Sequence, residues 1–134
     1  MTKIFLHFTI KGDGLDVIQV AKDLPPKADV FSKGEIFKYK FNREFIQKTN
    51  RFVYSIESEK DEGINSVFRR MEKDFRPYIK NVSKYTSKYN SVLDIVIYED
   101  KEEPITVFHT TLSKKSLSFI NKLNTRLSIS IFDW

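Results

Sequence analysis

The chain contains no cysteine. This absence excludes disulfide bonds, thiol catalysis and thiolate metal ligands, and it fits a reducing compartment. No stretch approaches the roughly 20 consecutive apolar residues that a membrane-spanning helix needs. The N-terminal residues MTKIFLHFTIKGDG alternate apolar and polar types and contain no small-residue cleavage site, so they do not form a secretory signal peptide. We therefore expect a cytoplasmic protein without a membrane-embedded part.

What the chain does contain is enough apolar side chain for one core. Hydrophobic residues make up 40% and charged residues 31% of the 134 residues, which is ordinary for a globular protein. The length fits one domain and no linker divides it, so we expect a single α+β domain over residues 1–134. The net charge of +5 permits nucleic-acid binding without indicating it.

The periodicity of apolar residues predicts both strands and helices. Strands are expected at residues 3–10, 28–31, 36–41, 51–58, 92–99, 105–111 and 126–134. Helices are expected at residues 15–24, 61–75, 78–89 and 114–123. This order predicts a single mostly antiparallel sheet with helices packed on one face, and a ferredoxin-like elaboration is one form of that α+β fold.

The helix expected near Asp61 carries the clearest core-facing stripe. Its members are Ile64, Val67, Phe68, Met71 and Phe75. In the first helix, the apolar face that we expect to be buried comprises Val17, Ile18, Val20, Ala21 and Leu24. The expected N-cap residues are Asp13 for the first helix and Ser113 for the last.

The segment RPYIKNVSKYTSKY combines basic and aromatic residues. Interleaved lysines and aromatic rings can follow a phosphate backbone and stack on bases. On a helical wheel, however, the lysines cluster on one side and the tyrosines on the opposite side, so the tyrosines face the core. What remains is a lysine stripe that is either a solvated face or an electrostatic docking surface for a protein or a nucleic acid: Lys80, Lys84 and Lys88.

The segment LPPKADVFSKGE is expected to connect the first helix to the next strands. Pro25 and Pro26 end the helix, and they remove two backbone N–H groups that an anion-binding loop would use. A loop fixed at both ends is a common position for binding residues. We therefore expect Lys27 and Lys33 to contact a protein partner and expect no phosphate site here.

Other patterns of functional residues are weak. Gly12-Asp13-Gly14 follows a strand but lacks the third glycine of a dinucleotide-binding loop, so it reads as a turn. His7 and His109 are the only histidines, and a metal site would require a carboxylate such as Glu57 or Asp94 to converge on them. No nucleophile or acid–base pair stands out. We expect no catalytic residue, no metal and no cofactor.

Three segments carry a resemblance to a known family. They are FTIKGDGLD near the start, DLPPKADVFSKGE after the first helix, and LSISIFDW at the end. Together they resemble a bacterial family known only as domain of unknown function 4279, over nearly the whole chain. The resemblance implies an α+β domain of bacteria or their phages, and it implies no known enzyme activity. Some members are similar in size and setting to immunity proteins, which neutralise a toxin by binding it.

We therefore expect a non-enzymatic protein-binding domain that acts by surface complementarity, with an immunity-type or phage/bacterial conflict-system protein as a specific form. The expected partner is a protein such as a toxin or a defence protein. The alternative is a nucleic-acid-associated module that uses the lysine stripe of the second helical region. An enzyme of unrecognised type is a third reading.

Overall fold

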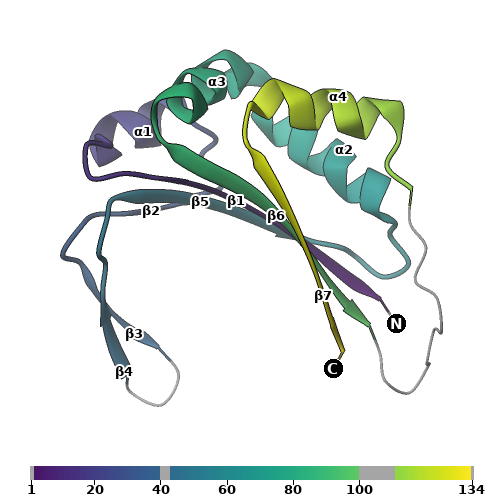
Figure 1. Ribbon diagram of the computed structural model, residues 1–134, viewed down its shortest axis with the longest axis horizontal. Helices are drawn as coiled ribbons and strands as arrows, with labels where there is room; N and C mark the ends of the chain where they lie inside the picture. Colours follow the sequence, from purple (N-terminus) through teal and green to yellow (C-terminus); the bar gives the residue numbers. More distant parts are fainter. Residues whose placement is uncertain (1, 40–42, 100–110, 134) are drawn as a thin grey trace.

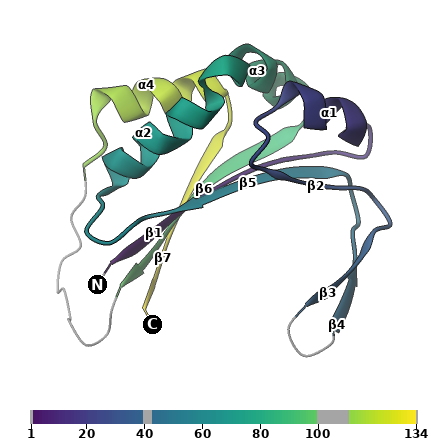
Figure 2. The same ribbon diagram turned by 180° about the vertical axis from the view of Figure 1, so that it is seen from behind.

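The computed structural model of the protein describes residues 2–39, 43–99 and 111–133. In this part of the chain, a five-stranded sheet forms one layer and helices form a second layer on one of its faces (Figures 1 and 2). The strands of the sheet are β1 (Lys3–Lys11), β2 (Asp29–Phe31), β5 (Arg51–Glu57), β6 (Asn90–Glu99) and β7 (Arg126–Asp133). The helices are α1 (Val17–Asp23), α2 (Ile64–Phe75), the 3₁₀ turn η2 (Arg76–Tyr78), α3 (Ile79–Lys88) and α4 (Lys114–Leu123). The expected α+β architecture is confirmed.

The order of the strands in the sheet is β2-β5-β1-β6-β7. β1 pairs antiparallel with both β5 and β6, and β2 pairs antiparallel with β5. Thus α1 connects two parallel strands that have β5 between them, and α2 with α3 connects two parallel strands that have β1 between them. These two split βαβ units form the ferredoxin-like arrangement, which α4 and β7 extend by one strand parallel to β6.

The core lies between the helices and alternate residues of the strands. On β1 the buried residues are Ile4, Leu6, Phe8 and Ile10, in the expected two-residue period. The predicted stripe of α2 is buried in full, from Ile64 to Phe75. Phe75 lies at the centre, with its ring 5.6 Å from that of Phe8, 4.8 Å from that of Tyr54 and 6.0 Å from that of Phe119. Ser113 caps α4 as predicted.

The prediction for the first helix was wrong in two respects. The N-cap is Asp16, whose side chain accepts hydrogen bonds from the amides of Ile18 and Gln19, so Asp13 is not the cap. Within α1 only Val20 is buried, whereas Ile18 is 70% exposed. The helix has just seven residues and lies at one end of the helical layer (Figure 1), so that a single row of its side chains meets the core.

One predicted strand lies outside the main sheet, and another falls largely outside the described residues. β3 (Ile36–Tyr39) pairs only with β4 (Arg43–Ile46), and this hairpin projects from the end of the sheet (Figure 1). The expected strand at residues 105–111 lies outside the described residues except for Thr111, and so does His109. None of the helices in the described ranges is long and apolar enough to cross a bilayer.

Candidate binding site on the uncovered face of the sheet

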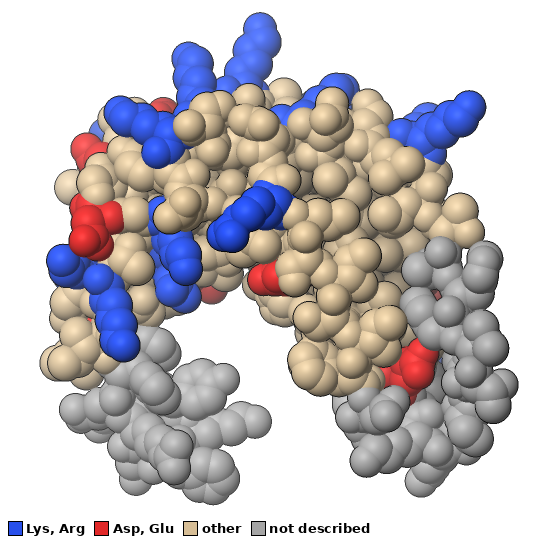
Figure 3. Space-filling view, in the orientation of Figure 1, with Lys and Arg blue, Asp and Glu red and all other residues tan. Residues whose placement is uncertain are grey.

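The face of the sheet opposite the helices is not covered by any described helix (Figures 1 and 2). The sheet arches over this side, and the space-filling view shows a hollow beneath it (Figure 3). Side chains on the central strands are therefore only half-buried, as in Phe5, His7 and Thr9 of β1 and in Val92, Asp94 and Val96 of β6. An uncovered concave surface of this kind is available to a partner.

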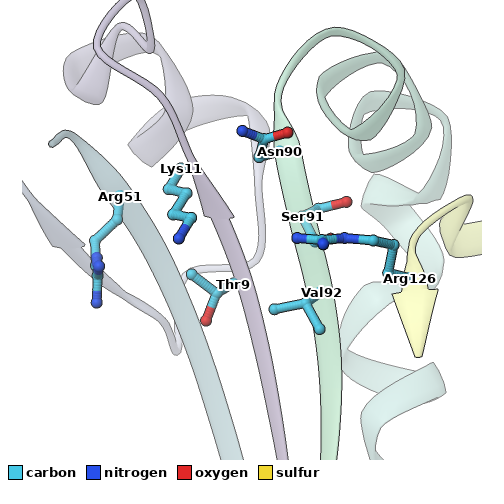
Figure 4. A pocket seen from close by; sticks show the side chains of 7 residues that line it. All are labelled: Thr9, Lys11, Arg51, Asn90, Ser91, Val92 and Arg126. Carbon is cyan, nitrogen blue, oxygen red and sulfur yellow. The ribbon is translucent and has the colours of Figure 1, made fainter. Parts of the chain in front are cut away.

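Three basic side chains gather at one end of this face. Lys11 at the end of β1, Arg51 at the start of β5 and Arg126 at the start of β7 line a cavity of about 180 Å³. Thr9 and Asn90 line it too, and the side chain of Arg126 crosses β6 towards β1, with Lys11 between the two arginines (Figure 4). We call this cavity the basic pocket.

The strand register brings these cations together. Lys11 and Arg51 are direct partners across the β1–β5 pair, and Arg126 is level with Val92 on β6. All three follow the outward-facing period of their strands, because the next residues inward, Ile10 and Phe52, are buried. Like charges at directly opposed positions repel, so the pairing of Lys11 with Arg51 destabilises the free protein.

The basic pocket lacks a counter-charge within the described part of the chain. No carboxylate lines it, and the Nε–H group of Arg51 is buried without a hydrogen-bond acceptor. Arg126 donates from its Nε to the carbonyl oxygen of Ser91 over 3.4 Å, a long contact that leaves the remaining N–H groups of its guanidinium available. The pocket can thus accept negative charge.

The opposite end of the uncovered face is aromatic. The ring of Tyr98 lies 5.5 Å from that of Phe5, edge to face, and 5.5 Å from that of Phe132, stacked. Lys3 lies 5.6 Å from the centre of the Phe5 ring and forms an ion pair with Glu57 at 3.3 Å. The face therefore runs from a cationic end without partners to an aromatic end whose charges are paired.

Between the two ends, three strands place a serine, a histidine and an aspartate side by side. Ser55 on β5 and Asp94 on β6 flank His7 on β1, and the distance from His7 Nδ1 to Ser55 Oγ is 2.7 Å. No hydrogen bond or ion pair links His7 to Asp94, although both are described. The backbone N–H groups here serve the sheet ladders, which leaves no preorganised pair of donors for an oxyanion. In this geometry the three side chains do not form the two linked hydrogen bonds of a catalytic triad.

The metal site that the two histidines could have formed, which we did not expect, has no counterpart among the described residues. They contain no group of three or more histidine, aspartate or glutamate residues that could hold a metal ion. His7 is within hydrogen-bonding distance of a serine hydroxyl, and Glu57 is paired with Lys3 at the other end of the face.

The predicted lysine stripe lies on the other side of the molecule. Lys80, Lys84 and Lys88 are exposed on α3 in the helical layer, and the tyrosines of α3 are packed inward as expected. Tyr85 donates a hydrogen bond to Asp23 over 2.9 Å, and burial together with this carboxylate raises the pKa of Tyr85 to about 12. Lys84 and Lys88 border a groove of about 300 Å³ between α1 and α3.

The two predicted loop lysines already have partners. Lys27 Nζ lies 3.1 Å from a carboxylate oxygen of Asp74, whose other oxygen accepts the hydroxyl of buried Tyr54 at 2.7 Å. Lys33 Nζ lies 3.4 Å from Asp13. The structure thus separates the five predicted binding lysines into the α3 stripe and this loop, and it brings none of them into the basic pocket.

The residues of the basic pocket were missed in the sequence. Each is a single basic residue at the end of an alternating strand, and Lys11, Arg51 and Arg126 are far apart along the chain. Only the sheet order and the register bring them together. The available signal was that these three cations fall on the polar side of their strands.

The comparisons with known proteins identify a family for the chain. A family model described as "Domain of unknown function (DUF4279)" matches residues 2–134. No curated protein and no solved structure matches the chain at a significant level. The match covers essentially the whole chain, and the protein therefore belongs to the DUF4279 family.

Proposed function

We propose that the protein is a non-enzymatic binding domain that holds an acidic segment of a partner protein against the uncovered face of its sheet. The observation that carries this proposal is the distribution of charge on that face. Cations without a lining carboxylate among the described residues occur at one end, Ser55, His7 and Asp94 lie at the centre, and aromatic side chains gather at the other end. A peptide segment can match both properties at once, with a carboxylate at one end and apolar side chains along its length.

The same distribution favours a protein over a nucleic acid. A single strand of nucleic acid needs a positive track along its whole backbone. On this face the cations of the basic pocket end near Thr9, and Asp94 at the centre and Glu57 towards the far end would repel phosphates. A polyanion therefore fits the uncovered face poorly, whereas one anionic group at the basic end fits it well.

We also propose that the uncovered face has no catalytic role. The serine, histidine and aspartate at the centre of the face lack an oxyanion site and a hydrogen bond between His7 and Asp94. Binding by surface complementarity is also how an immunity-type protein of a bacterial conflict system neutralises its toxin, and we place the protein in this class. We propose a cytoplasmic setting, and the absence of cysteine in the sequence is compatible with it.

The test is selection of peptides from a displayed random library on the immobilised protein, followed by affinity measurement on three forms. The variant Val96→Lys changes a half-buried side chain directly opposite Phe5 on the uncovered face. The variant Lys84→Glu changes an exposed side chain of the α3 stripe and is the matched control on the opposite layer. We expect the selected peptides to share an acidic residue next to apolar residues. We also expect Val96→Lys to abolish their binding while Lys84→Glu leaves it unchanged.

Other outcomes overturn the proposal. Loss of binding in Lys84→Glu, with Val96→Lys unaffected, moves the binding surface to the helices. Binding of single-stranded oligonucleotides that falls steeply with salt would establish a nucleic-acid module instead. Ester hydrolysis that disappears in Ser55→Ala would establish an enzyme.

A further inference from the structure

We propose that the basic pocket is a binding site for one oxyanionic group, carboxylate or phosphate, with Lys11, Arg51 and Arg126 as its ligands. This inference rests on the proposed function to the extent that the partner's carboxylate is the group bound there. It adds where the partner is anchored and which side chains hold the anchor.

The first support is electrostatic. Three strands each bring one cation to the pocket, and Lys11 and Arg51 are directly opposed across a strand pair. Such an arrangement costs stability in the free protein unless an opposite charge occupies the space between the cations. No described carboxylate lines the pocket, so a bound anion would supply the compensating charge.

The second support is an unsatisfied donor. The Nε–H of Arg51 is buried and makes no hydrogen bond within the described residues. Buried polar groups in folded proteins almost always have a partner, and a bound water or anion is one way to satisfy such a donor. A charged N–H donor is best satisfied by an anionic oxygen, since charge-assisted hydrogen bonds are shorter and stronger than neutral ones.

The third support is size and chemistry. The cavity of about 180 Å³ has room for one carboxylate or phosphate with a few waters, because a water molecule takes about 30 Å³ of liquid. The hydroxyl of Thr9 and the amide of Asn90 add uncharged donors to the wall (Figure 4). The pocket therefore suits one anionic group and not an extended polyanion.

The position of the pocket indicates how a bound segment is oriented. It is lined by the end of β1 and the starts of β5 and β7, and the β3–β4 hairpin projects from this end of the sheet (Figure 1). A segment that follows the hollow would reach the cations at this end. An acidic side chain or a terminal carboxylate of the segment then takes the place of the simple anion.

The experiment is a titration followed by nuclear magnetic resonance at constant ionic strength. Inorganic phosphate and N-acetylglycine are the two probes, representing free phosphate and a peptide carboxylate, and chloride is the reference. The side-chain Nε–H signal of Arg51 is the most direct reporter because this group lacks an acceptor in the free protein. We expect saturable shifts with one-to-one stoichiometry at Arg51, and at the backbone amides of Lys11 and Arg126. If N-acetylglycine binds more tightly than phosphate, the group bound is a peptide carboxylate.

Two variants and a control give the result its specificity. Arg51→Gln and Arg126→Gln each remove a charged donor, and each should raise the dissociation constant of the probe by about 10- to 100-fold. Lys114→Gln removes an exposed charge from α4 and should change nothing. In addition, Lys11→Gln should raise the melting temperature in chloride while abolishing the rise that the anion produces, since it relieves repulsion and removes a ligand. If Lys11 had only a structural role, Lys11→Gln would lower the melting temperature both in chloride and in the presence of the anion.

The outcomes separate this inference from the proposed function. If the shifts are absent, or are equal at the lysines of α3, the anion site does not exist. If the anion binds, but the selected peptides bind Val96→Lys as tightly as the wild type, the anion site is retained. The uncovered face is then not the surface that binds the peptides. If Val96→Lys abolishes peptide binding and Arg51→Gln leaves it intact, the uncovered face is the peptide surface. The basic pocket is then not where the peptide carboxylate is bound.

Discussion

Truncation of Phe75 tests the packing that supports the uncovered face. Its side chain is fully buried and makes edge-to-face contacts with the rings of Phe8, Tyr54 and Phe119, so it joins the sheet to α2 and α4. Replacing a buried phenylalanine by alanine costs about 3–5 kcal/mol, and lost aromatic pairs add about 0.5–1.5 kcal/mol each. We therefore expect Phe75→Ala to lower the free energy of unfolding by about 5 kcal/mol, a large share of the ~5–15 kcal/mol of an ordinary domain.

Urea denaturation followed by far-ultraviolet circular dichroism measures this loss. With a slope near 2 kcal/mol per molar urea, a loss of about 5 kcal/mol lowers the midpoint by about 2.5 M. Phe75→Leu keeps most of the apolar volume and should cost about 1.5 kcal/mol. The control Ile18→Ala removes a side chain that is 70% exposed and should stay within about 0.5 kcal/mol of the wild type. A loss below about 2 kcal/mol for Phe75→Ala would refute the central position assigned to this ring.

Three further predictions concern polar groups. Tyr54→Phe removes the hydrogen bond to Asp74 and should cost about 1.5 kcal/mol in urea unfolding, so an unchanged midpoint contradicts it. The pKa of Glu62 is lowered to about 2, chiefly by its hydrogen bond from Arg70. Because the folded pKa lies below the ordinary value of 4.5, this stabilisation is complete above pH 4.5 and is lost as the pH falls towards 2. Melting temperatures of Glu62→Gln should thus fall less steeply with acid, and an equally steep fall would contradict this. Finally, replacing Lys80, Lys84 and Lys88 together by glutamine should leave the urea midpoint nearly unchanged, because all three side chains are exposed. A variant that unfolds would mean that these side chains of α3 are packed and do not face the solvent.

The sequence predicted those helices and strands whose apolar side chains recur at a regular spacing and pack along their whole length against one neighbouring element. The stripe of α2 was assigned correctly because its helix lies along the sheet and buries every member from Ile64 to Phe75. In α1 the same reasoning failed. Ile18 follows the apolar period but points away, because the short helix meets the core along one row only.

The local pattern of apolar residues also could not show which strand lies at the edge of the sheet. Leu127, Ile129 and Ile131 alternate as a core strand should, and in register they match the buried residues of β6. They are nonetheless exposed, since β7 is the edge strand in the described sheet. The hairpin of β3 and β4 carries strand-like sequence as well, yet it pairs only with itself.

The candidate site could not be found from the sequence for a different reason. The predicted lysines were chosen because they are close along the chain, either as a helical stripe or within one loop. The basic pocket combines Lys11, Arg51 and Arg126, which become neighbours only through the strand order β5-β1-β6-β7. That order depends on long-range pairing, which no short motif encodes.

The central place of β1 has a consequence for how the protein reaches its native state. This strand, which comes first along the chain, pairs on one side with β5 and on the other with β6, so that Lys3 is opposite Tyr98. Pairing strands that are so far apart along the chain closes a long loop, which slows folding. Domains dominated by such pairings fold in about milliseconds to seconds. During synthesis β1 emerges long before β6, and its unpaired edges are open to wrong pairings until then. The order of the strands therefore leaves one edge of β1 without its native partner until β6 has been synthesised.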